Sequence, residues 1–539
     1  MIGLVLFMLL VFIAVLSMIA ITLKVQSSLR KQNYISGVRY GKVVQQLQDK
    51  HELHRFGFGQ YFRRQYGELS IFSISMNAIG VFPIALLLLA PMVMQGGLVN
   101  SLFVYSGVGL LFIVIVALIG QYLSTQPTAG GLYHAALRRG GTWLGSFVGG
   151  LQLMGQLCML LGYSYGVVYF LRLLQLPMLS WLEHPGAFTL AVAGVIVLQG
   201  VIGLLKSSYY PILHNASIAV QVVGVIALLI VCYQALRGDS YSGMHLFALD
   251  TSVANWFSNA NQLTPMNIGL MVALACRFFI GGDASAQSAE ETIEPKVRIA
   301  WSTLLSTCYS YMVGLILLLV LAIVYMNLGL QATNASGTEW LSLLAASIPG
   351  LGNVLIVLAL LSCWLSSTTM LHVSARTLMA MARDGIVPLS DQLSKISYQK
   401  QEPRHALVGV QFIALGLLLA LFLVGAQHYF ITVSLLAFIC YALIYVLLLY
   451  GVPLDQKTAL WKLEEWDRPI RLVSVLLLIG LASAAGAALA YTELLIVFVP
   501  LVLLWLYAVV KRGFATKLLQ YDAGGSRDLF EMESQMPLH

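Results

Sequence analysis

Apolar runs long enough to cross a lipid bilayer recur along almost the whole of this 539-residue chain. A membrane-spanning helix needs about 20 consecutive, mostly apolar residues, and it bonds its own backbone polar groups within the segment. Thirteen such runs are expected to form helices, centred on residues 2–23, 69–92, 100–122, 143–170, 187–205, 211–235, 266–288, 300–326, 351–373, 405–425, 428–450, 470–491 and 493–510. With 59% hydrophobic and 10% charged residues, the chain does not have the composition of a soluble domain. The sequence therefore predicts an all-α, polytopic membrane protein.

Lys and Arg residues concentrate in alternate loops of this thirteen-helix arrangement. Cytoplasmic loops are enriched in these residues, so the basic linker 24–67 is taken as cytoplasmic. Of the 30 Lys and Arg residues, only Arg172, Arg237 and Arg277 then fall outside cytoplasmic segments. This predicts a plasma or inner cell membrane protein with its N-terminus outside and its C-terminus in the cytoplasm. The net charge of +7 reflects this topology and contact with anionic membrane lipids, and no nucleic-acid partner is expected.

The first apolar run is expected to be an uncleaved extra helix. No basic residue precedes it and no small-residue cleavage site follows it, unlike a signal peptide. The expected organisation is an N-terminal helix at 1–23, a basic cytoplasmic linker at 24–67, a core at 68–451, two C-terminal helices within 452–512 and a cytoplasmic tail at 513–539.

The core contains two consecutive sets of five expected spans, 68–236 and 265–451. Because five is an odd number, the two sets have opposite orientations, as in the five-plus-five inverted repeats of secondary transporters. In those folds the first helix of each half is often broken near the middle of the membrane. Both corresponding runs carry residues suited to a break, namely Ser73, Ser75, Asn77, Gly80 and Pro83 in the first, and Gly281, Gly282 and Asp283 in the second.

Three motifs carry a resemblance to a known family. They are Gln126–Tyr133 (QPTAGGLY), Gly282–Thr292 (GDASAQSAEET) and Ser374–Pro388 (SARTLMAMARDGIVP). These are similar, in order and spacing, to "YPTAGGLY", "YDASAHMAEET" and "SASRMLYAFARDGALP" of amino acid–polyamine–organocation permeases. The chain resembles most the branch of bacterial amino acid permeases and fungal GABA and choline permeases, from about Glu68 to Arg512. The N-terminal helix and linker have no counterpart in the usual twelve-helix pattern.

The resemblance implies a secondary active transporter that moves an amino acid or a related amine by alternating access. In such permeases the substrate carboxylate meets free backbone N–H groups where helix 1 unwinds, and its amino group meets carbonyls where helix 6 unwinds. Only one glycine of the family's usual Gly-Ser-Gly remains here, in Ala78-Ile79-Gly80. Phe279 is either an aromatic lid or a packing residue. The expected substrate-binding residues are Ser75, Asn77, Ala78, Ile79, Gly80, Arg277, Phe279, Ile280, Gly281, Gly282 and Asp283.

Arg277 departs from the family pattern, which usually has an aromatic residue six positions before the acidic one. A charge at membrane depth is costly, so it usually has a partner or faces a cavity. Arg277 could extend to the membrane surface, pair with Asp283, or face the pocket and neutralise a second substrate carboxylate. The last interpretation favours glutamate or aspartate, whereas Asp283 as an ammonium partner favours amines.

Polar residues near the other core helices suggest ion binding and gating. Ser366, Ser367, Thr368 and Thr369 could supply oxygen ligands for Na⁺, although such hydroxyls commonly bond back to their own helix. His214 could titrate as a proton relay, or it could be a hydrogen-bonded residue at a helix end. The expected cytoplasmic gate pairs Glu290 and Glu291 with Arg376 and Arg383, and the alternative is solvated loop charge.

Other functional classes have less support in the sequence. The chain contains no HExxH motif and no nucleophile elbow, so an enzyme is not expected. Its six cysteines and ten histidines show no metal-type grouping, so no metal or cofactor is expected. A nutrient sensor derived from a transporter, or an organic-amine permease for choline or polyamines, remain the alternatives.

Overall fold

The computed structural model describes residues 49–50, 52–54, 56, 58–96, 98–204, 209–237, 264–327, 350–396, 402–425, 429–451, 459–461 and 466–512. The expected helix at 1–23, most of the linker and the tail 513–539 lie outside these residues. Within them every named element is a helix, and the extended pairing is a single parallel bridge between Tyr66 and Thr292. The predicted all-α class is confirmed.

The helices of the first half follow one another along the chain with short connections. They are α3 (Glu68–Ile79), α4 (Val81–Gly96), α5 (Leu98–Thr125), α6 (Leu132–Leu173), the 3₁₀ helix η1 (Pro177–Glu183), α7 (Pro185–Gly203) and α8 (Tyr210–Arg237). A kink at Gly141, whose φ is 64°, divides α6 into a short and a long part. The long part of α6 extends the predicted run 143–170 at both ends.

The remaining helices begin after a gap in the described residues. They are α10 (Pro265–Cys276), the 3₁₀ helix η4 (Gly282–Glu291), α11 (Pro295–Asn327), α13 (Leu351–Arg383), α14 (Ser390–Leu393), α15 (Arg404–Val424), α16 (Tyr429–Leu449), α17 (Asp467–Ala487) and α18 (Tyr491–Arg512). The start of α10 is capped because the Thr264 hydroxyl accepts a hydrogen bond from the Asn267 N–H, with Pro265 in the first turn.

Eleven helices of the described residues are long and apolar enough to cross a membrane. The expected span at 266–288 is not among them, because it divides into the short apolar helix α10 and the polar η4. The expected span at 351–373 is longer in the structure and reaches Arg383. The chain is thus a multi-pass integral membrane protein.

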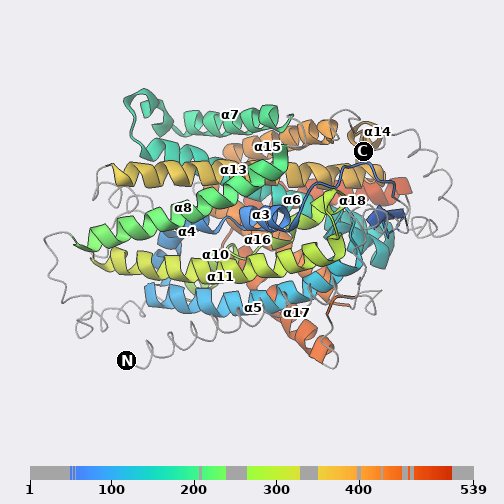
Figure 1. The fold of residues 1–539 in the computed structure, drawn as a ribbon, viewed down its shortest axis with the longest axis horizontal. Helices are drawn as coiled ribbons and strands as arrows, with labels where there is room; N and C mark the ends of the chain where they lie inside the picture. Colours follow the sequence, from blue (N-terminus) through green and yellow to red (C-terminus); the bar gives the residue numbers. More distant parts are fainter. Residues whose placement is uncertain are drawn as a thin grey trace, which may run out of the picture.

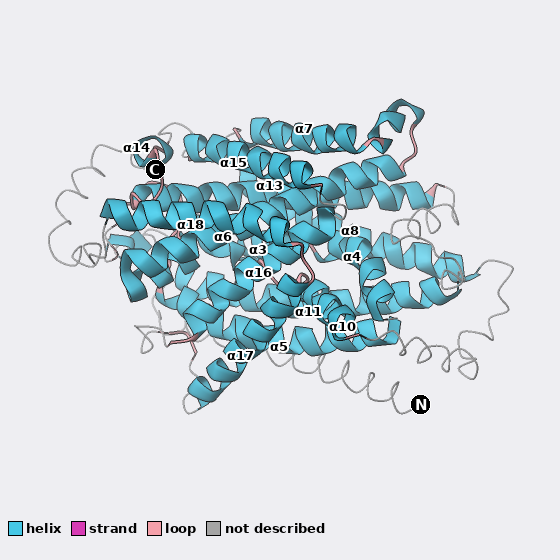
Figure 2. Ribbon diagram, turned by 180° about the vertical axis from the view of Figure 1, so that it is seen from behind, coloured by secondary structure: helices cyan, strands magenta, loops and turns pink. Residues whose placement is uncertain are grey.

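The helices run largely along one direction, and α6 lies at their centre (Figure 1). It packs against α13 and α16, while α3 and η4 lie against α11. In α6 the most apolar window is 94% buried, whereas in α18 it is 17% buried. Helices α7 and α17 lie at opposite margins of the bundle, and α17 slants away from the other helices (Figure 2). The central helices therefore hold the buried polar residues, and the outer helices present apolar side chains.

Candidate functional site

The first interrupted helix breaks at Gly80. There α3 ends in a left-handed residue, with φ 62° and ψ 51°, and α4 begins at Val81. The Tyr163 hydroxyl of α6 lies at the C-terminal end of α3, 2.7 Å from the Ala78 carbonyl oxygen and 2.6 Å from that of Ile79. A Cβ at residue 80 would come within 2.4 Å of this hydroxyl oxygen. Both the backbone conformation and the close approach therefore require glycine.

The second interrupted helix breaks at residues 277–281, between α10 and η4. Gly281 has φ 92°, and the added Cβ of a larger residue would lie 3.4 Å from the carbonyl carbon and oxygen of Ala78. On its other side this Cβ would approach Met159 of α6 to 2.7 Å. The two breaks are therefore in contact with each other at the centre of the bundle. Chain segments about 200 residues apart in the sequence meet there.

Arg277 lies at this second break, with 1% of its surface exposed. Its guanidinium carbon is 5.2 Å from the centre of the Tyr163 ring, and its Nη1 has no hydrogen-bond partner among the residues that the structure describes. This burial excludes the interpretation in which the side chain extends to the membrane surface. A cation over an aromatic ring is stabilised by the negative face of the ring.

Asp283 is equally buried but faces a different helix. Its Oδ1 accepts a hydrogen bond of 3.2 Å from the Tyr445 hydroxyl of α16, and its Oδ2 has no partner within the described part of the chain. Among the described residues, no ion pair joins Asp283 to Arg277. The expected pair between them is therefore not formed, because Arg277 contacts Tyr163 on α6 whereas Asp283 bonds to Tyr445 on α16.

Further buried polar residues on α6, η4 and α16 have side-chain atoms without a partner in the described residues, and the sequence interpretation did not select them. The side-chain amides of Gln156 on α6 and Gln287 on η4 have no hydrogen-bond partner for either their oxygen or their nitrogen in the described residues. The hydroxyls of Ser285 and Tyr441 also have no partner there. Leaving a buried polar group unpaired costs about 1–3 kcal/mol. Ser285 and Gln287 follow Asp283 within η4, and unpaired buried polar atoms of this kind are typical of a site where a polar ligand completes the hydrogen bonding.

One sequence signal could have identified the α6 residues. Gln152, Gln156 and Tyr163 are spaced at i, i+4 and i+11 within an otherwise apolar run, so they lie on one helix face. The Oε1 of Gln152 accepts a hydrogen bond of 3.0 Å from the Tyr133 N–H, which connects this face to the QPTAGGLY motif.

Three of the expected substrate-binding side chains are occupied by contacts within the bundle. Ser75 lies 3.0 Å from the hydroxyl of Ser302 on α11. The Asn77 amide donates to the His214 carbonyl on α8 and accepts from Gln221. These two side chains therefore connect α3 to its neighbours.

Phe279 is the third of these side chains. Its ring packs among aromatic residues of α5 and α11, with centroids 5.2 Å from Tyr105, 5.7 Å from Phe112 and 6.3 Å from Tyr311. This environment favours the packing interpretation of Phe279 over the lid. The neighbouring Ile280 is fully buried as well.

The hydroxyls of α13 are used in different ways. Ser367 contacts Ser164 and Gln199, on α6 and α7, at 2.8 and 3.0 Å. Thr368 donates to the carbonyl of its own helix at Trp364. The hydroxyl of Ser366 is buried without a partner in the described residues. Thr369 likewise donates to the Leu365 carbonyl, so of the four expected ion ligands Ser366 is the one whose oxygen is not already engaged in the described residues.

Two ion pairs join η4 to the end of α13. The Arg383 guanidinium lies 2.8 and 3.1 Å from the carboxylate oxygens of Glu290, and Arg376 pairs with Glu291. Glu290 also accepts a hydrogen bond of 3.2 Å from the Ala129 N–H, in the QPTAGGLY motif. The two carboxylates are 1% and 2% exposed, so they are not solvated loop charges. These four charged residues are called the ion-pair cluster.

Burial and charge shift the pKa values of carboxyls around this cluster. Burial disfavours the Glu290 carboxylate, but Arg383 outweighs it and holds the Glu290 pKa below its ordinary value. For Glu402, burial dominates and Glu291 adds to it, so that its pKa rises to about 8 despite Arg376. Glu402 is 2% exposed, and its Oε1 has no partner among the described residues.

The fold and site together define an α-helical membrane transporter, with two broken helices that meet at buried charges. Comparison with known proteins identifies its family. The model of the family described as amino acid permease matches residues 66–513, so the chain belongs to this family. The family places the protein among transporters rather than enzymes.

Two relatives from Schizosaccharomyces pombe are similar over most of their length. The uncharacterized amino-acid permease C1039.01 is 24% identical over 450 residues, covering 80% of this chain and 76% of the relative. The uncharacterized amino-acid permease C74.04 is 21% identical over 452 residues, covering 80% and 78%. These comparisons support transport of amino acids by this chain.

Proposed function

We propose that the protein is a secondary active transporter, and that an amino acid binds where the α3–α4 break meets the α10–η4 break. The observation that carries this proposal is the contact between the two breaks, with the Nη1 of Arg277 and the Oδ2 of Asp283 at the second break, buried and without a partner in the described residues. Broken helices supply free backbone groups at membrane depth without exposing them to lipid. A zwitterion brings both a donor and an acceptor to such a site.

Arg277 and Asp283 are the proposed contacts for the charges of the substrate. The unpartnered Nη1 of Arg277 suits a carboxylate, because a guanidinium binds carboxylates through paired hydrogen bonds. The unpartnered Oδ2 of Asp283 suits the ammonium group. If the backbone N–H groups at the start of α4 bind one carboxylate, Arg277 is available for a second. We therefore propose an acidic amino acid, such as glutamate or aspartate, as the preferred substrate.

Alternating access requires that the site open to one side of the membrane at a time. We propose that the ion-pair cluster is the cytoplasmic gate, because it joins η4 to α13 next to the site. In this proposal the protein lies in the plasma or inner cell membrane, with its N-terminus outside and its C-terminus in the cytoplasm. The two sets 68–236 and 265–451 form inverted halves that move relative to each other, with 452–512 outside the repeat.

Two alternatives concern the cargo and the mode of action. A nutrient sensor would bind the same ligand without moving it, and an organic-amine permease would use Asp283 without needing Arg277. Coupling to Na⁺ would involve Ser366, whose oxygen has no partner in the described residues. Coupling to protons would involve buried titratable groups such as Glu402.

Counterflow uptake into proteoliposomes tests the proposal. Purified protein would be assayed with labelled glutamate, aspartate, GABA, neutral and cationic amino acids, choline and polyamines, with and without Na⁺ or proton gradients. Saturable uptake of acidic amino acids is the expected result. Ligand-induced thermal stabilisation without any uptake would instead indicate a sensor, and uptake of choline or polyamines alone would indicate an organic-amine permease.

A further inference from the structure

A segment before the first core helix lies across the ion-pair cluster. It comprises the described residues between 49 and 66, and is called the strap. The family match begins at residue 66, so all of the strap except Tyr66 lies before the matched part of the chain. Leu53, Phe62 and Tyr66 of the strap are 1%, 3% and 0% exposed. The strap is thus packed into the protein and is not a solvated tail.

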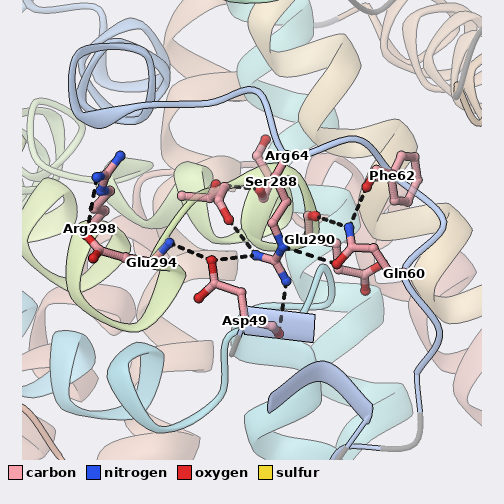
Figure 3. A network of polar contacts seen from close by, with 9 residues as sticks. Asp49, Gln60, Phe62, Arg64, Ser288, Glu290, Glu294 and Arg298 are labelled. Carbon is pink, nitrogen blue, oxygen red and sulfur yellow. Dashed lines mark hydrogen bonds and ion pairs between the residues drawn. The ribbon is translucent and has the colours of Figure 1, made fainter. Parts of the chain in front are cut away.

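Arg64 is the centre of the polar contacts between the strap and η4 (Figure 3). Its guanidinium lies 3.6 Å from the Asp49 carboxylate and 3.1 Å from the Gln60 Oε1, and it donates to the Thr292 carbonyl just after η4. The Arg64 side chain is 5% exposed. A buried guanidinium is stable only where several acceptors surround it, so these contacts depend on one another.

The strap also bonds directly to the backbone at the end of η4. The N–H groups of Gln65 and Tyr66 donate to the Glu291 carbonyl at 2.9 and 3.0 Å, and the Ile293 N–H donates to the Tyr66 carbonyl at 3.2 Å. The Gln60 amide donates to the Glu290 carbonyl at 2.9 Å, and the Asp49 carboxylate accepts from the Glu294 N–H at 3.0 Å. The end of η4 cannot move away without breaking this set of hydrogen bonds.

An aromatic residue of the strap covers the second ion pair. The Arg383 guanidinium lies 4.0 Å from the centre of the Phe58 ring, and this ring stacks on His134 at 5.2 Å. Arg383 is the partner of Glu290. The strap therefore contacts Glu290 and Glu291 through hydrogen bonds to their backbone carbonyls, and it contacts Arg383 through the Phe58 ring.

We propose that the strap is an additional layer of the gate, and that it must detach before η4 can separate from α13. The inference rests on the proposed function only in treating the ion-pair cluster as a gate. The strap holds the protein closed at this end, so its release limits the rate of opening. An interaction that detaches the strap, such as one at the linker that precedes it, would then regulate transport.

The chain offers a matched pair of variants for the test. Arg64→Ala removes the central side chain of the strap contacts, whereas Arg63→Ala removes the adjacent arginine, which is exposed. Hydrogen–deuterium exchange of the full-length protein in nanodiscs would report on the Tyr66 and Ile293 amides, which join the strap to η4. Counterflow of the acidic amino acids would be measured on the same preparations.

We expect these amides to exchange at least about tenfold faster in Arg64→Ala, the scale of losing a hydrogen bond to a charged group. Counterflow should become faster in the same variant, and Arg63→Ala should match the wild type in both measurements. If Arg64→Ala does not fold, Phe58→Leu takes its place, because Phe58 is only half-buried and removing its ring releases Arg383.

Unchanged exchange in the strap variants would overturn the inference, and so would faster exchange with unchanged counterflow, because the strap would then be structural only. Absence of counterflow in the wild type would contradict the proposed function instead. The exchange measurement needs no substrate, so the two failures are distinguishable.

Discussion

Replacing Arg383 with alanine tests how strongly the ion-pair cluster holds η4 against α13. Arg383 makes two hydrogen bonds to Glu290, at 2.8 and 3.1 Å, and the side chains are 16% and 1% exposed. Removing one partner of a buried ion pair costs about 3–5 kcal/mol, because the other charge stays buried without a counter-ion. Since Arg383 is partly exposed, we expect the lower end, about 3 kcal/mol, which would raise the open population roughly 150-fold.

Hydrogen–deuterium exchange at Ala129, whose N–H donates to Glu290, would measure this opening. The decisive comparison adds Glu290→Gln to the Arg383→Ala variant. Removing the stranded charge should recover about 1–3 kcal/mol of the loss, because an unpaired buried group costs more than an absent pair. If the double variant opens as readily as Arg383→Ala, or the two losses simply add, the reasoning is wrong.

Three further predictions follow from particular positions. Gly281→Ala should lower the free energy of unfolding by about 1–3 kcal/mol and abolish counterflow, because φ is 92° there. Gly416 has open space around it, so Gly416→Ala should leave both quantities unchanged. Equal behaviour of the two variants would contradict the tight contact between the breaks. Burial raises the pKa of Glu402 to about 8 from 4.5, so its contribution to stability is complete below pH 4.5 and is lost as pH rises through 8. The unfolding temperature should therefore fall less steeply between pH 5 and about 8.5 in Glu402→Gln, and an unchanged pH profile would refute this. Ser366→Ala should lower any Na⁺ stimulation of uptake. Thr368→Ala should not, because the Thr368 hydroxyl already bonds to its own helix. Equal effects of the two variants would remove Ser366 from the proposed ion site.

The two interrupted helices could be predicted from sequence because glycine and small polar residues weaken a helix where they fall within an apolar run. Gly80 and Gly281 both adopt left-handed backbone conformations at the predicted interruptions. The charged residues of the ion-pair cluster were also identifiable, since they stand at the ends of apolar runs. Their burial was not, because it depends on Arg383 and Glu290 meeting from segments 93 residues apart.

The residues around Arg277 could be predicted less well. A Tyr441 or Tyr445 in a long apolar helix resembles an ordinary membrane residue, and the sequence does not show how each helix is rotated about its axis. The same limit applies to Ser367, which turns toward α6 and α7. The strap was interpreted only as a basic linker, because its contacts depend on the fold of η4.

The most direct test of the account compares substrate preference before and after the charge at residue 277 is removed. Initial counterflow rates for glutamate and leucine would be measured for the wild type and Arg277→Trp in matched proteoliposomes. The account predicts that glutamate is preferred by the wild type, and that this preference falls at least about tenfold in the variant, the scale of one hydrogen bond to a charged group. The same preference in both proteins, with only thermal stability lost in the variant, would contradict it and make Arg277 a structural residue.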